Sequence, residues 1–172
     1  YGDLIVEDLE EHRVDTRWVY REDDEDSKVV AVLVEEGSGD RIFISGMPIV
    51  SQEGGKVPGD AVEESDLLLI DSYCPVLARH AAEKARDSGT KVLSDLEGTE
   101  NAEELLSLTD ILIVPEGFVS RYGGVSDDPV QASSQLLKEG PEAVIVTRGE
   151  MGCVGAYGDR VFHRDSFDVD VV

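Results

Sequence analysis

Short apolar runs alternate with helix-like stretches through the second half of the chain. The runs predict strands at Leu67–Asp71, Lys91–Ser94, Ile111–Val114 and Ala143–Thr147. Apolar residues at helical spacing predict helices at Pro75–Ser88, Ala102–Leu108, Phe118–Tyr122 and Pro129–Glu139. A β-α-β-α-β-α-β order with short links is typical of a parallel sheet covered by helices on both faces, so the pattern predicts an α/β fold.

The first part of the chain has a different pattern. Gly2–His12 has the apolar spacing of a helix. Two runs rich in β-branched residues, Lys28–Glu35 and Arg41–Ser45, are joined by the short glycine-containing link Glu36–Asp40, which predicts a β-hairpin. Gly46–Gly59 contains several glycines and prolines and is predicted to be a loop. The hairpin therefore precedes the alternating region as a separate small element.

Polar residues follow the predicted strands at the carboxyl edge of the sheet. Open α/β sheets bind their ligands at this edge. The last strand runs into a glycine-bearing loop and then into a hairpin-like segment, Cys153–Arg164. Glycine allows a close approach of backbone N–H groups to a phosphate or ribose, although the same glycines can serve only a tight turn. The candidate residues at this edge are Asp71, Asp95, Glu116, Thr147, Arg148, Gly149 and Gly152.

Charge and composition exclude several partners. The formal net charge is −23, so nucleic acid and anionic membrane surfaces are not expected to bind. No apolar run approaches the roughly 18 residues of a membrane span. Cys74 and Cys153 show no metal or redox spacing, which favours a reduced, cytoplasmic protein. Abundant Asp and Glu with few Lys favour a salt-rich cytoplasm, where self-repulsion is screened; the alternative is an ordinary acidic surface.

The ordered set of segments resembles the ribokinase-like (PfkB) family of carbohydrate kinases. A hairpin at Val29–Ser45 precedes the alternating region, as the family's lid does. LLSLTDILIVPEGFVSRYGG at Leu105–Gly124 and GPEAVIVTRGEMG at Gly140–Gly152 are similar to the family's helix-strand-helix and strand-loop segments. VFHRDSFDVDVV at Val161–Val172 is similar to the segment before the family's Gly-Ala-Gly-Asp signature. Asp95–Glu97 and the tail from His163 to Phe167 resemble ketohexokinase-like members.

The resemblance implies a ribokinase-like three-layer sandwich with a mostly parallel sheet and a small β-hairpin lid. Residues 1–172 would form part of one kinase domain, with the lid at about 28–46 and the α/β core at about 60–172. The implied activity is transfer of the γ-phosphoryl group of ATP, with Mg²⁺, to a hydroxyl of a small sugar. Homodimerisation through the lid is also implied.

The family register assigns roles to individual residues. Thr147, Arg148, Gly149 and Gly152 would contact ATP, although an arginine at a loop tip is often only solvated. Asp71 would accept hydrogen bonds from sugar hydroxyls, unless it serves as the N-cap of the following helix. Asp95 would lie on the substrate side, near phosphate or a Mg²⁺-bound water, unless it caps its loop. Ser45 would meet the sugar from the lid.

The sequence also departs from the family pattern. Pro115 and Phe118 stand where the family has the Asn and Glu that organise Mg²⁺, which leaves Glu116 as the carboxylate for a water-mediated metal contact. The chain ends before the Gly-Ala-Gly-Asp sequence that holds the general base, so these 172 residues alone are expected to be inactive. Two alternatives remain open, namely a nucleoside kinase of the same fold and a non-catalytic nucleotide-binding domain.

Overall fold

The chain forms two compact units in a computed structural model. One unit is Tyr1–Lys56 together with Val169–Val172, and the other is Val57–Asp168. The structure describes residues 1–21, 27, 29–37, 39, 41–46 and 57–169. Within these residues no helix is long and apolar enough to cross a membrane.

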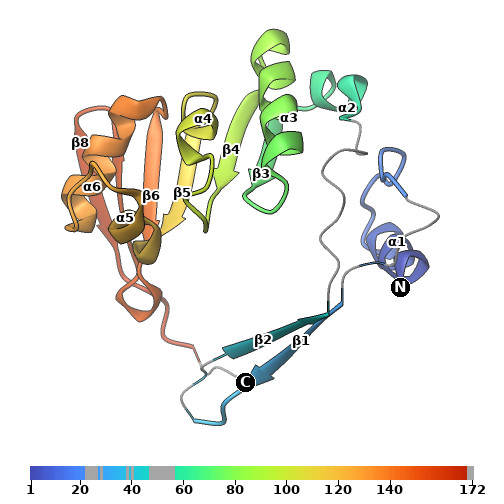
Figure 1. Ribbon diagram of the computed structural model, residues 1–172, viewed down its shortest axis with the longest axis horizontal. Coiled ribbons are helices and arrows are strands. Elements are labelled where there is room, and N and C mark those ends of the chain that lie inside the picture. Colours follow the sequence, from blue (N-terminus) through green and yellow to red (C-terminus); the bar gives the residue numbers. More distant parts are fainter. Residues whose placement is uncertain (22–26, 28, 38, 40, 47–56, 170–172) are drawn as a thin grey trace. The chain divides into compact units, whose positions relative to one another are not determined.

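The described residues of the first unit form one helix and a β-hairpin (Figure 1). Helix α1 is Gly2–Glu11, and strands β1 (Val29–Val34) and β2 (Arg41–Gly46) pair antiparallel, as the sequence predicts. Apolar side chains lie on both faces of the hairpin. Large ones such as Leu33 and Phe43 are more than half exposed. The hairpin therefore offers two apolar faces.

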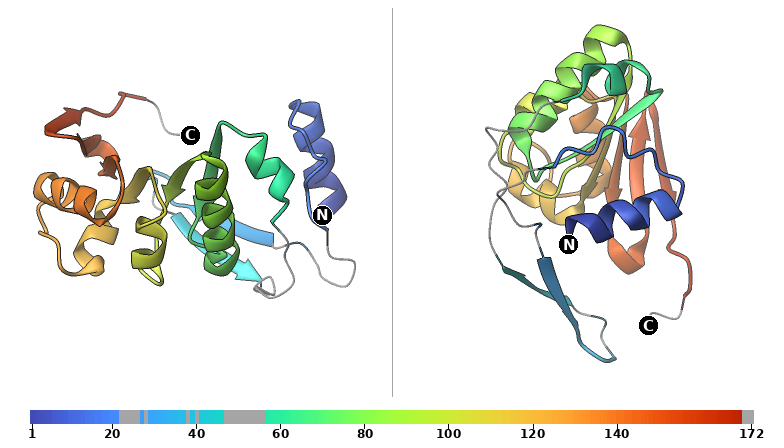
Figure 2. Two further views of the ribbon diagram at one scale, coloured as in Figure 1. Left: turned by 90° about the horizontal axis from the view of Figure 1, so that it is seen from above. Right: turned by 90° about the vertical axis from the view of Figure 1, so that its right-hand side faces the viewer.

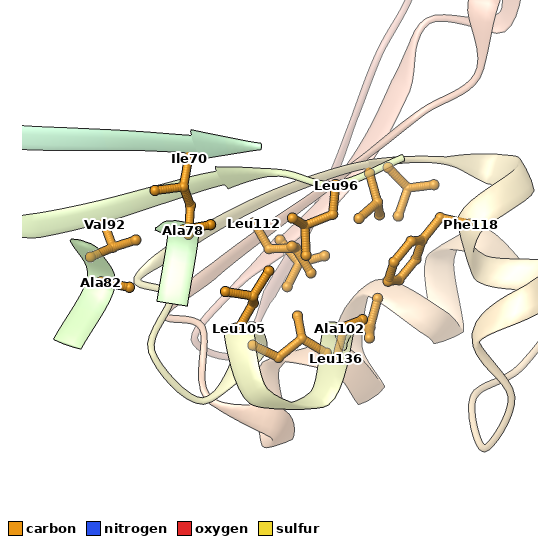
Figure 3. Close-up of a cluster of buried hydrophobic side chains, with 14 of the residues drawn as sticks. Ile70, Ala78, Ala82, Val92, Leu96, Ala102, Leu105, Leu112, Phe118 and Leu136 are labelled. Atoms are coloured by element: carbon orange, nitrogen blue, oxygen red, sulfur yellow. The ribbon is translucent and has the colours of Figure 1, made fainter. Parts of the chain in front are cut away.

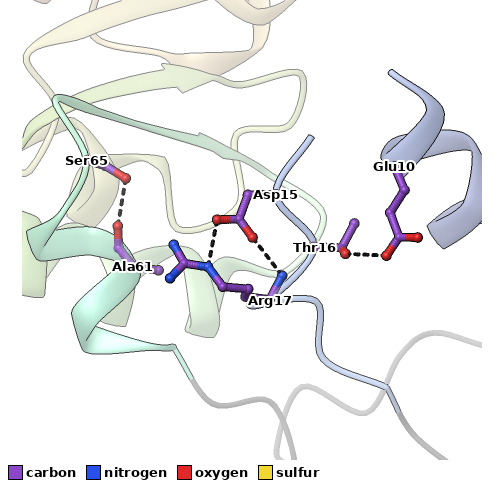
Figure 4. A network of polar contacts seen from close by, with 6 residues as sticks. All are labelled: Glu10, Asp15, Thr16, Arg17, Ala61 and Ser65. Atoms are coloured by element: carbon purple, nitrogen blue, oxygen red, sulfur yellow. Dashed lines mark hydrogen bonds and ion pairs between the residues drawn. The ribbon is translucent and has the colours of Figure 1, made fainter. Parts of the chain in front are cut away.

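Polar side chains fix the turn after α1. The hydroxyl of Thr16 donates to Oε1 of Glu10 at 2.8 Å, and Nε of Arg17 donates to Oδ2 of Asp15 at 2.7 Å (Figure 4). The Arg17 guanidinium also lowers the pKa of Asp15, after the larger effect of the Arg17 backbone N–H. A separate contact in the second unit joins Ser65 Oγ to the carbonyl oxygen of Ala61 at 2.6 Å.

The second unit alternates strands and helices and ends in two further strands. The helices are α2 (Gly59–Glu63), α3 (Pro75–Ser88), α4 (Ala102–Leu106), α5 (Glu116–Tyr122) and α6 (Pro129–Leu136), with 3-10 turns η1 (Leu137–Glu139) and η2 (Gly149–Met151). The strands are β3 (Leu67–Asp71), β4 (Lys91–Asp95), β5 (Ile111–Pro115), β6 (Ala143–Thr147), β7 (Cys153–Tyr157) and β8 (Arg160–Arg164).

These strands form one six-stranded sheet in the order β3-β4-β5-β6-β7-β8. Strands β3 to β6 are parallel, and β7 and β8 run antiparallel to their neighbours. The α/β fold with a mostly parallel sheet and a separate hairpin is confirmed. The register places Asp71 beside Asp95 and Pro115 beside Thr147, which fixes the carboxyl edge of the sheet.

The core lies between one face of this sheet and the helices (Figures 1 and 3). Alternate strand residues such as Ile70, Val92, Leu112 and Val144 are buried there. They meet the apolar sides of α3, α4, α5 and α6, including Ala82, Leu105, Phe118 and Leu136. Helix α3 lies against β3 and β4, and α6 lies against β6 and β7 (Figure 2). Within residues 57–168 the helical layer thus covers this one face.

The opposite sheet face also carries apolar side chains. Leu67 and Leu69 are 47% and 66% exposed, and Ile113 and Ile145 are half-buried. Near β8 this face is closed locally, because the ring of Phe162 lies over Gly155. A β-carbon at Gly155 would lie 2.3 Å from Cζ of Phe162, so only glycine fits beneath the ring.

Most predicted boundaries agree with the structure to within two residues. Helix α3 begins at Pro75 and ends before Gly89, whose φ of 81° is left-handed, as expected of a glycine stop. Helix α5 begins two residues earlier than predicted, and the last three residues of the predicted Pro129–Glu139 helix form η1. Helix α2 was not predicted. Most of the predicted Gly46–Gly59 loop lies outside the described residues.

The amino ends of three strands are tied together by charge. Nζ of Lys91 lies 2.6 Å from Oδ1 of Asp110 and 3.1 Å from Oε1 of Glu142. The second carboxylate oxygen of Asp110 accepts a hydrogen bond from the backbone N–H of Val92 at 2.8 Å. Because Asp110 and Glu142 precede β5 and β6, this cluster fixes the strand starts at the edge opposite the candidate site.

Candidate functional site

Asp71 ends strand β3 and is exposed at the carboxyl edge. Its Oδ1 accepts a hydrogen bond from the backbone N–H of Tyr73 at 2.9 Å, which shapes the turn into α3. The N-cap residue of α3 is Cys74, and no side chain caps that helix. The alternative reading of Asp71 as a helix N-cap is therefore wrong, and its carboxylate faces solvent while it shapes the turn.

Ser72 joins the ends of β3 and β4. Its hydroxyl oxygen accepts hydrogen bonds from the backbone N–H groups of Glu97 at 3.2 Å and Gly98 at 3.4 Å. Arg121 of α5 donates to the carbonyl oxygen of Glu97 at 2.8 Å from the other side. Neither role was predicted, because a side chain that bonds to distant backbone groups leaves no pattern in the sequence.

Asp95 is the register partner of Asp71 on the neighbouring strand. Both carboxylates lie on the same side of the sheet, because the pairing sets their strands in phase. Asp95 is exposed, and no hydrogen bond or ion pair joins its side chain to the rest of the described chain. Its carboxylate has the exposure needed to accept hydrogen bonds from a ligand.

The loop from Thr147 to Gly152 is a short reversal between β6 and β7. The backbone N–H of Arg148 donates to the carbonyl oxygen of Gly152 at 2.8 Å, and that of Gly152 donates to Gly149 at 2.9 Å. A β-carbon on Gly152, which has a φ of 75°, would lie 2.0 Å from the carbonyl oxygen of Arg164. Packing and backbone conformation therefore account for Gly152 without a ligand.

Gly149 differs from Gly152 in its surroundings. Its φ is 55°, and no atom lies within 4 Å of the position of a β-carbon. The backbone at Gly149 is thus open to a ligand, and Thr147 beside it is exposed. Of the glycines named from the sequence, Gly149 retains a binding interpretation and Gly152 has a structural explanation.

Arg148 and Glu116 meet across the ends of β5 and β6. Glu116 directly follows Pro115 and Arg148 directly follows Thr147. Pro115 and Thr147 are register partners. Nε of Arg148 lies 3.4 Å from Oε1 of Glu116, and the two side chains are 22% and 39% exposed. This ion pair brings together two predicted site residues that are 32 positions apart in sequence.

The surroundings of Glu116 do not form a metal site. No group of three or more His, Cys, Asp or Glu residues that could hold a metal ion occurs in the part of the chain that the structure describes. Phe118, which stands at the second Mg²⁺-organising position, is fully buried and stacks on Tyr122 at 5.3 Å between ring centroids. Burial, and to a lesser extent the charges of Glu139 and Glu103, raise the pKa of Tyr122. Segment 115–118 thus offers Mg²⁺ one carboxylate, that of Glu116, beside a buried ring, and the water-mediated contact stays a prediction.

Ser45 lies on β2 opposite Val30 and is exposed. It belongs to the hairpin unit, whereas the other candidate residues belong to the sheet unit. Its contact with a sugar therefore stays a prediction. The sheet unit brings together Asp71 with Asp95, and Glu116 with Arg148.

Comparisons with known proteins show a family match and a curated relative. A family model described as "pfkB family carbohydrate kinase" matches residues 1–172. A 2-dehydro-3-deoxygalactonokinase of Haloferax volcanii is 23% identical over an alignment that covers 99% of this chain and 60% of the relative.

Solved structures agree in fold. A protein assigned as ribokinase II from E. coli, in complex with ATP and Mg²⁺, has a TM-score of 0.81 at 23% identity, covering 100% of this chain and 60% of that one. A fructokinase from Xylella fastidiosa has a TM-score of 0.81 at 15% identity, covering 99% of this chain and 59% of that one. The chain thus spans about 60% of the length of these relatives. Since the family model covers every residue, the chain belongs to the pfkB family of carbohydrate kinases.

Proposed function

We propose that the protein containing this chain is an ATP-dependent kinase that transfers the γ-phosphoryl group to a hydroxyl of a small sugar. The family match over residues 1–172 carries this proposal. The arrangement of the sheet edge supports it, because acidic and basic candidates lie at the carboxyl ends of parallel strands, where such folds bind ligands. An ATP and Mg²⁺ complex of a structurally similar protein supports the choice of phosphate donor.

Thr147, Arg148 and Gly149 form the proposed nucleotide side. The exposed Thr147 hydroxyl can bond to a ribose or phosphate oxygen, and the open backbone at Gly149 permits close approach. The Arg148 guanidinium supplies positive charge for a phosphate. Gly152 contributes by permitting the reversal that sets this loop against β8. Phosphoryl transfer depends mainly on positioning and charge stabilisation, which these groups would supply for ATP.

Asp71 and Asp95 form the proposed sugar side. Two adjacent carboxylates can accept hydrogen bonds from neighbouring hydroxyls of one sugar. Ser45 of the hairpin would add a contact from a lid. The name of the Haloferax volcanii relative makes a 2-dehydro-3-deoxy sugar acid a first compound to test beside ribose and fructose.

The general base is assigned to no residue of this chain. A carboxylate must take the proton from the attacking hydroxyl, and the family resemblance assigns it to a Gly-Ala-Gly-Asp sequence, which residues 1–172 do not contain. We therefore propose that these residues by themselves bind ligands but do not transfer phosphate. Mg²⁺ would arrive with ATP, held mainly by phosphate oxygens and water.

We also propose that the protein resides in a reducing cytoplasm and forms a homodimer. The cysteines of the described chain, Cys74 and Cys153, are free thiols, which suits a reducing compartment. The two apolar faces of the β1–β2 hairpin favour a homodimer formed through the lid, because apolar faces and open strand edges favour pairing.

Sugar-dependent release of ADP by the full-length protein tests the proposed function. Each sugar is offered with ATP and Mg²⁺, and nucleosides serve as competing acceptors. Release of ADP with sugars and not with nucleosides supports the proposal. Preference for nucleosides indicates the nucleoside kinase, and nucleotide binding without turnover on either class indicates the non-catalytic domain. Translation of the gene beyond Val172 provides an independent check for the Gly-Ala-Gly-Asp sequence.

A further inference from the structure

We propose that Glu116 positions the guanidinium of Arg148 for a nucleotide phosphate and does not ligate Mg²⁺. This inference rests on the nucleotide site proposed above and names the anion-contacting residue within it. The ion pair between Nε of Arg148 and Oε1 of Glu116, at 3.4 Å, is the observation that carries it.

Arg148 is held from several sides. Its backbone N–H donates to Gly152 at 2.8 Å, and its carbonyl oxygen accepts from the N–H of Met151 at 3.1 Å. Nη2 of the guanidinium lies 3.5 Å from the sulfur of Met151. With Nε toward Glu116, two of the three guanidinium nitrogens face groups of this chain, and the exposed fraction of the Arg148 side chain, 22%, is low for an arginine at a loop tip.

The third nitrogen of the guanidinium, Nη1, is available to a ligand. In residues 57–169, which the structure describes without a gap, no acceptor contacts Nη1 of Arg148. Arginine presents five N–H donors in a planar fork, so a phosphate can still bond to the donors that Glu116 and Met151 leave free. A fixed, partly buried guanidinium loses less conformational freedom when it binds an anion than a solvated one does.

Glu116 is unsuited to the alternative metal role. Its carboxylate already faces a guanidinium, and no group of three or more His, Cys, Asp or Glu side chains that could hold a metal ion occurs among the described residues. The neighbouring position 118 is filled by the buried ring of Phe118. Charge pairing with Arg148 therefore explains the acidic residue at 116 without a metal.

Three possible roles of Glu116 predict different effects of Glu116→Gln on ADP affinity measured in EDTA. Removal of a negative charge near an anion site strengthens anion binding if Glu116 acts only through its charge. If Glu116 positions Arg148, the same change weakens binding by up to about tenfold, because the neutral amide can accept from Nε but no longer pairs with the guanidinium charge. If Glu116 ligates Mg²⁺, affinity without metal does not fall, and only the Mg²⁺-dependent part of binding is lost.

The experiment measures the Kd of ADP by calorimetry with the full-length protein, in EDTA and in Mg²⁺. The variants are Glu116→Gln, Arg148→Met and the double variant, with Glu150→Gln as a matched charge change in the same loop. We expect weaker ADP binding by about the same factor in both single variants and in the double variant, with or without Mg²⁺. Glu150→Gln leaves the Kd unchanged or lowers it. Melting temperatures establish that each variant is folded.

Several outcomes overturn the inference. Unchanged or tighter binding of ADP to Glu116→Gln in EDTA excludes a positioning role. Losses that multiply in the double variant show that the two residues act independently. A wild-type protein that binds no ADP contradicts the proposed function itself, whereas normal wild-type binding with an unaffected Glu116→Gln variant contradicts only the role of Glu116.

Discussion

The carbonyl oxygen of Arg164 occupies the space where a β-carbon of Gly152 would lie, with 2.0 Å between the two positions. The segment that follows β8 thus packs directly against the loop that follows β6. The proposed nucleotide loop is set in place by backbone packing at one glycine and is open at the other, Gly149.

Gly152→Ala is expected to destabilise the protein more than any other glycine change in this loop. The added methyl group must displace backbone at a φ of 75°, which costs about 2–4 kcal/mol. Chemical unfolding measures the loss. Gly158→Ala is the matched control, because Gly158 has a φ of 55° and open space around it; its cost is about 1 kcal/mol. Equal losses at the two positions contradict the packing argument.

Gly149→Ala separates binding from stability. Its φ of 55° and open surroundings match those of Gly158, so both changes are expected to lower stability by a similar amount of about 1 kcal/mol. If the backbone at Gly149 approaches a nucleotide, only Gly149→Ala weakens ADP binding. The comparison uses calorimetric Kd values and melting temperatures of both variants. Unchanged ADP affinity in Gly149→Ala leaves this glycine with a turn role alone.

The buried hydroxyls of Ser94 and Thr109 form a polar pair 2.5 Å apart. Thr109 donates to the carbonyl oxygen of Leu105 at 2.7 Å, so Ser94 donates to Thr109. Thr109→Val leaves the fully buried Ser94 hydroxyl without its partner, and about 1–3 kcal/mol of stability is expected to be lost. Thr109→Ser retains the hydroxyl and should lose less. Urea unfolding of both variants measures the difference, and equal losses would indicate that the methyl group matters more than the hydrogen bond.

Alkaline pH is expected to weaken the amino edge of the sheet. Hydrogen bonds from Lys91 to Asp110 and then to Glu142 raise the pKa of Lys91. A lysine whose pKa is higher in the folded than in the unfolded state stabilises the fold. This contribution is fully present below the unfolded pKa of about 10.5 and disappears as the pH rises through the folded pKa. The pKa of Tyr122 is also raised, so its titration lowers the stability of the fold in the same direction as the pH rises. In unfolding curves from pH 7 to 11, Lys91→Met should flatten the decline, and Lys138→Met should not.

Asp71→Asn tests the sugar side without disturbing the turn. The amide oxygen can still accept the hydrogen bond from Tyr73, so the melting temperature should change little. Loss of the charge should raise the KM for the sugar about tenfold or more and leave the KM for ATP unchanged. Steady-state kinetics of the full-length enzyme measure both constants. A rise in the KM for ATP alone would place Asp71 on the nucleotide side.

Salt should stabilise this acidic chain. With a net charge of −23, self-repulsion is strong at low ionic strength, and the Debye length falls to about 3 Å at 1 M salt. We expect the melting temperature to rise steeply between low and molar KCl, as measured by circular dichroism. Screening depends on ionic strength, so NaCl at the same concentrations should raise the melting temperature by a similar amount. A flat response to KCl would favour the ordinary acidic surface.

Periodicity and terminal signals predicted most elements of the sheet unit. Pro75 and Gly89 bound α3 because proline suits the first helical turn and glycine adopts the left-handed stop. Helix α2 escaped prediction because five residues with one buried side chain, Val62, carry no detectable period. Short helices of this kind depend on tertiary packing, which the sequence pattern does not reveal.

The candidate site could be predicted as a set of residues but not as a set of contacts. Residue types at strand ends identified Glu116 and Arg148 separately, whereas their pairing follows from the register of β5 with β6. Register depends on the whole sheet and cannot be read from either segment. The reading of Asp71 as a helix cap was wrong because the chain makes an extra turn before α3 begins.

The change of strand direction between β6 and β7 has a consequence for local stability. A parallel strand after β6 would require a long crossover connection. The antiparallel β7 instead follows β6 through a short loop at the carboxyl edge of the sheet. Strand β8 lies at the edge of the described sheet, so it is expected to exchange its amide hydrogens sooner than β5 or β6. Because Arg164 ends β8 and its backbone fixes Gly152, fraying of β8 would release the Arg148 loop while the parallel strands stay folded. If this loop binds phosphate as proposed, phosphate binding and the order of this edge strand are coupled, and ligand binding should slow hydrogen exchange in β8.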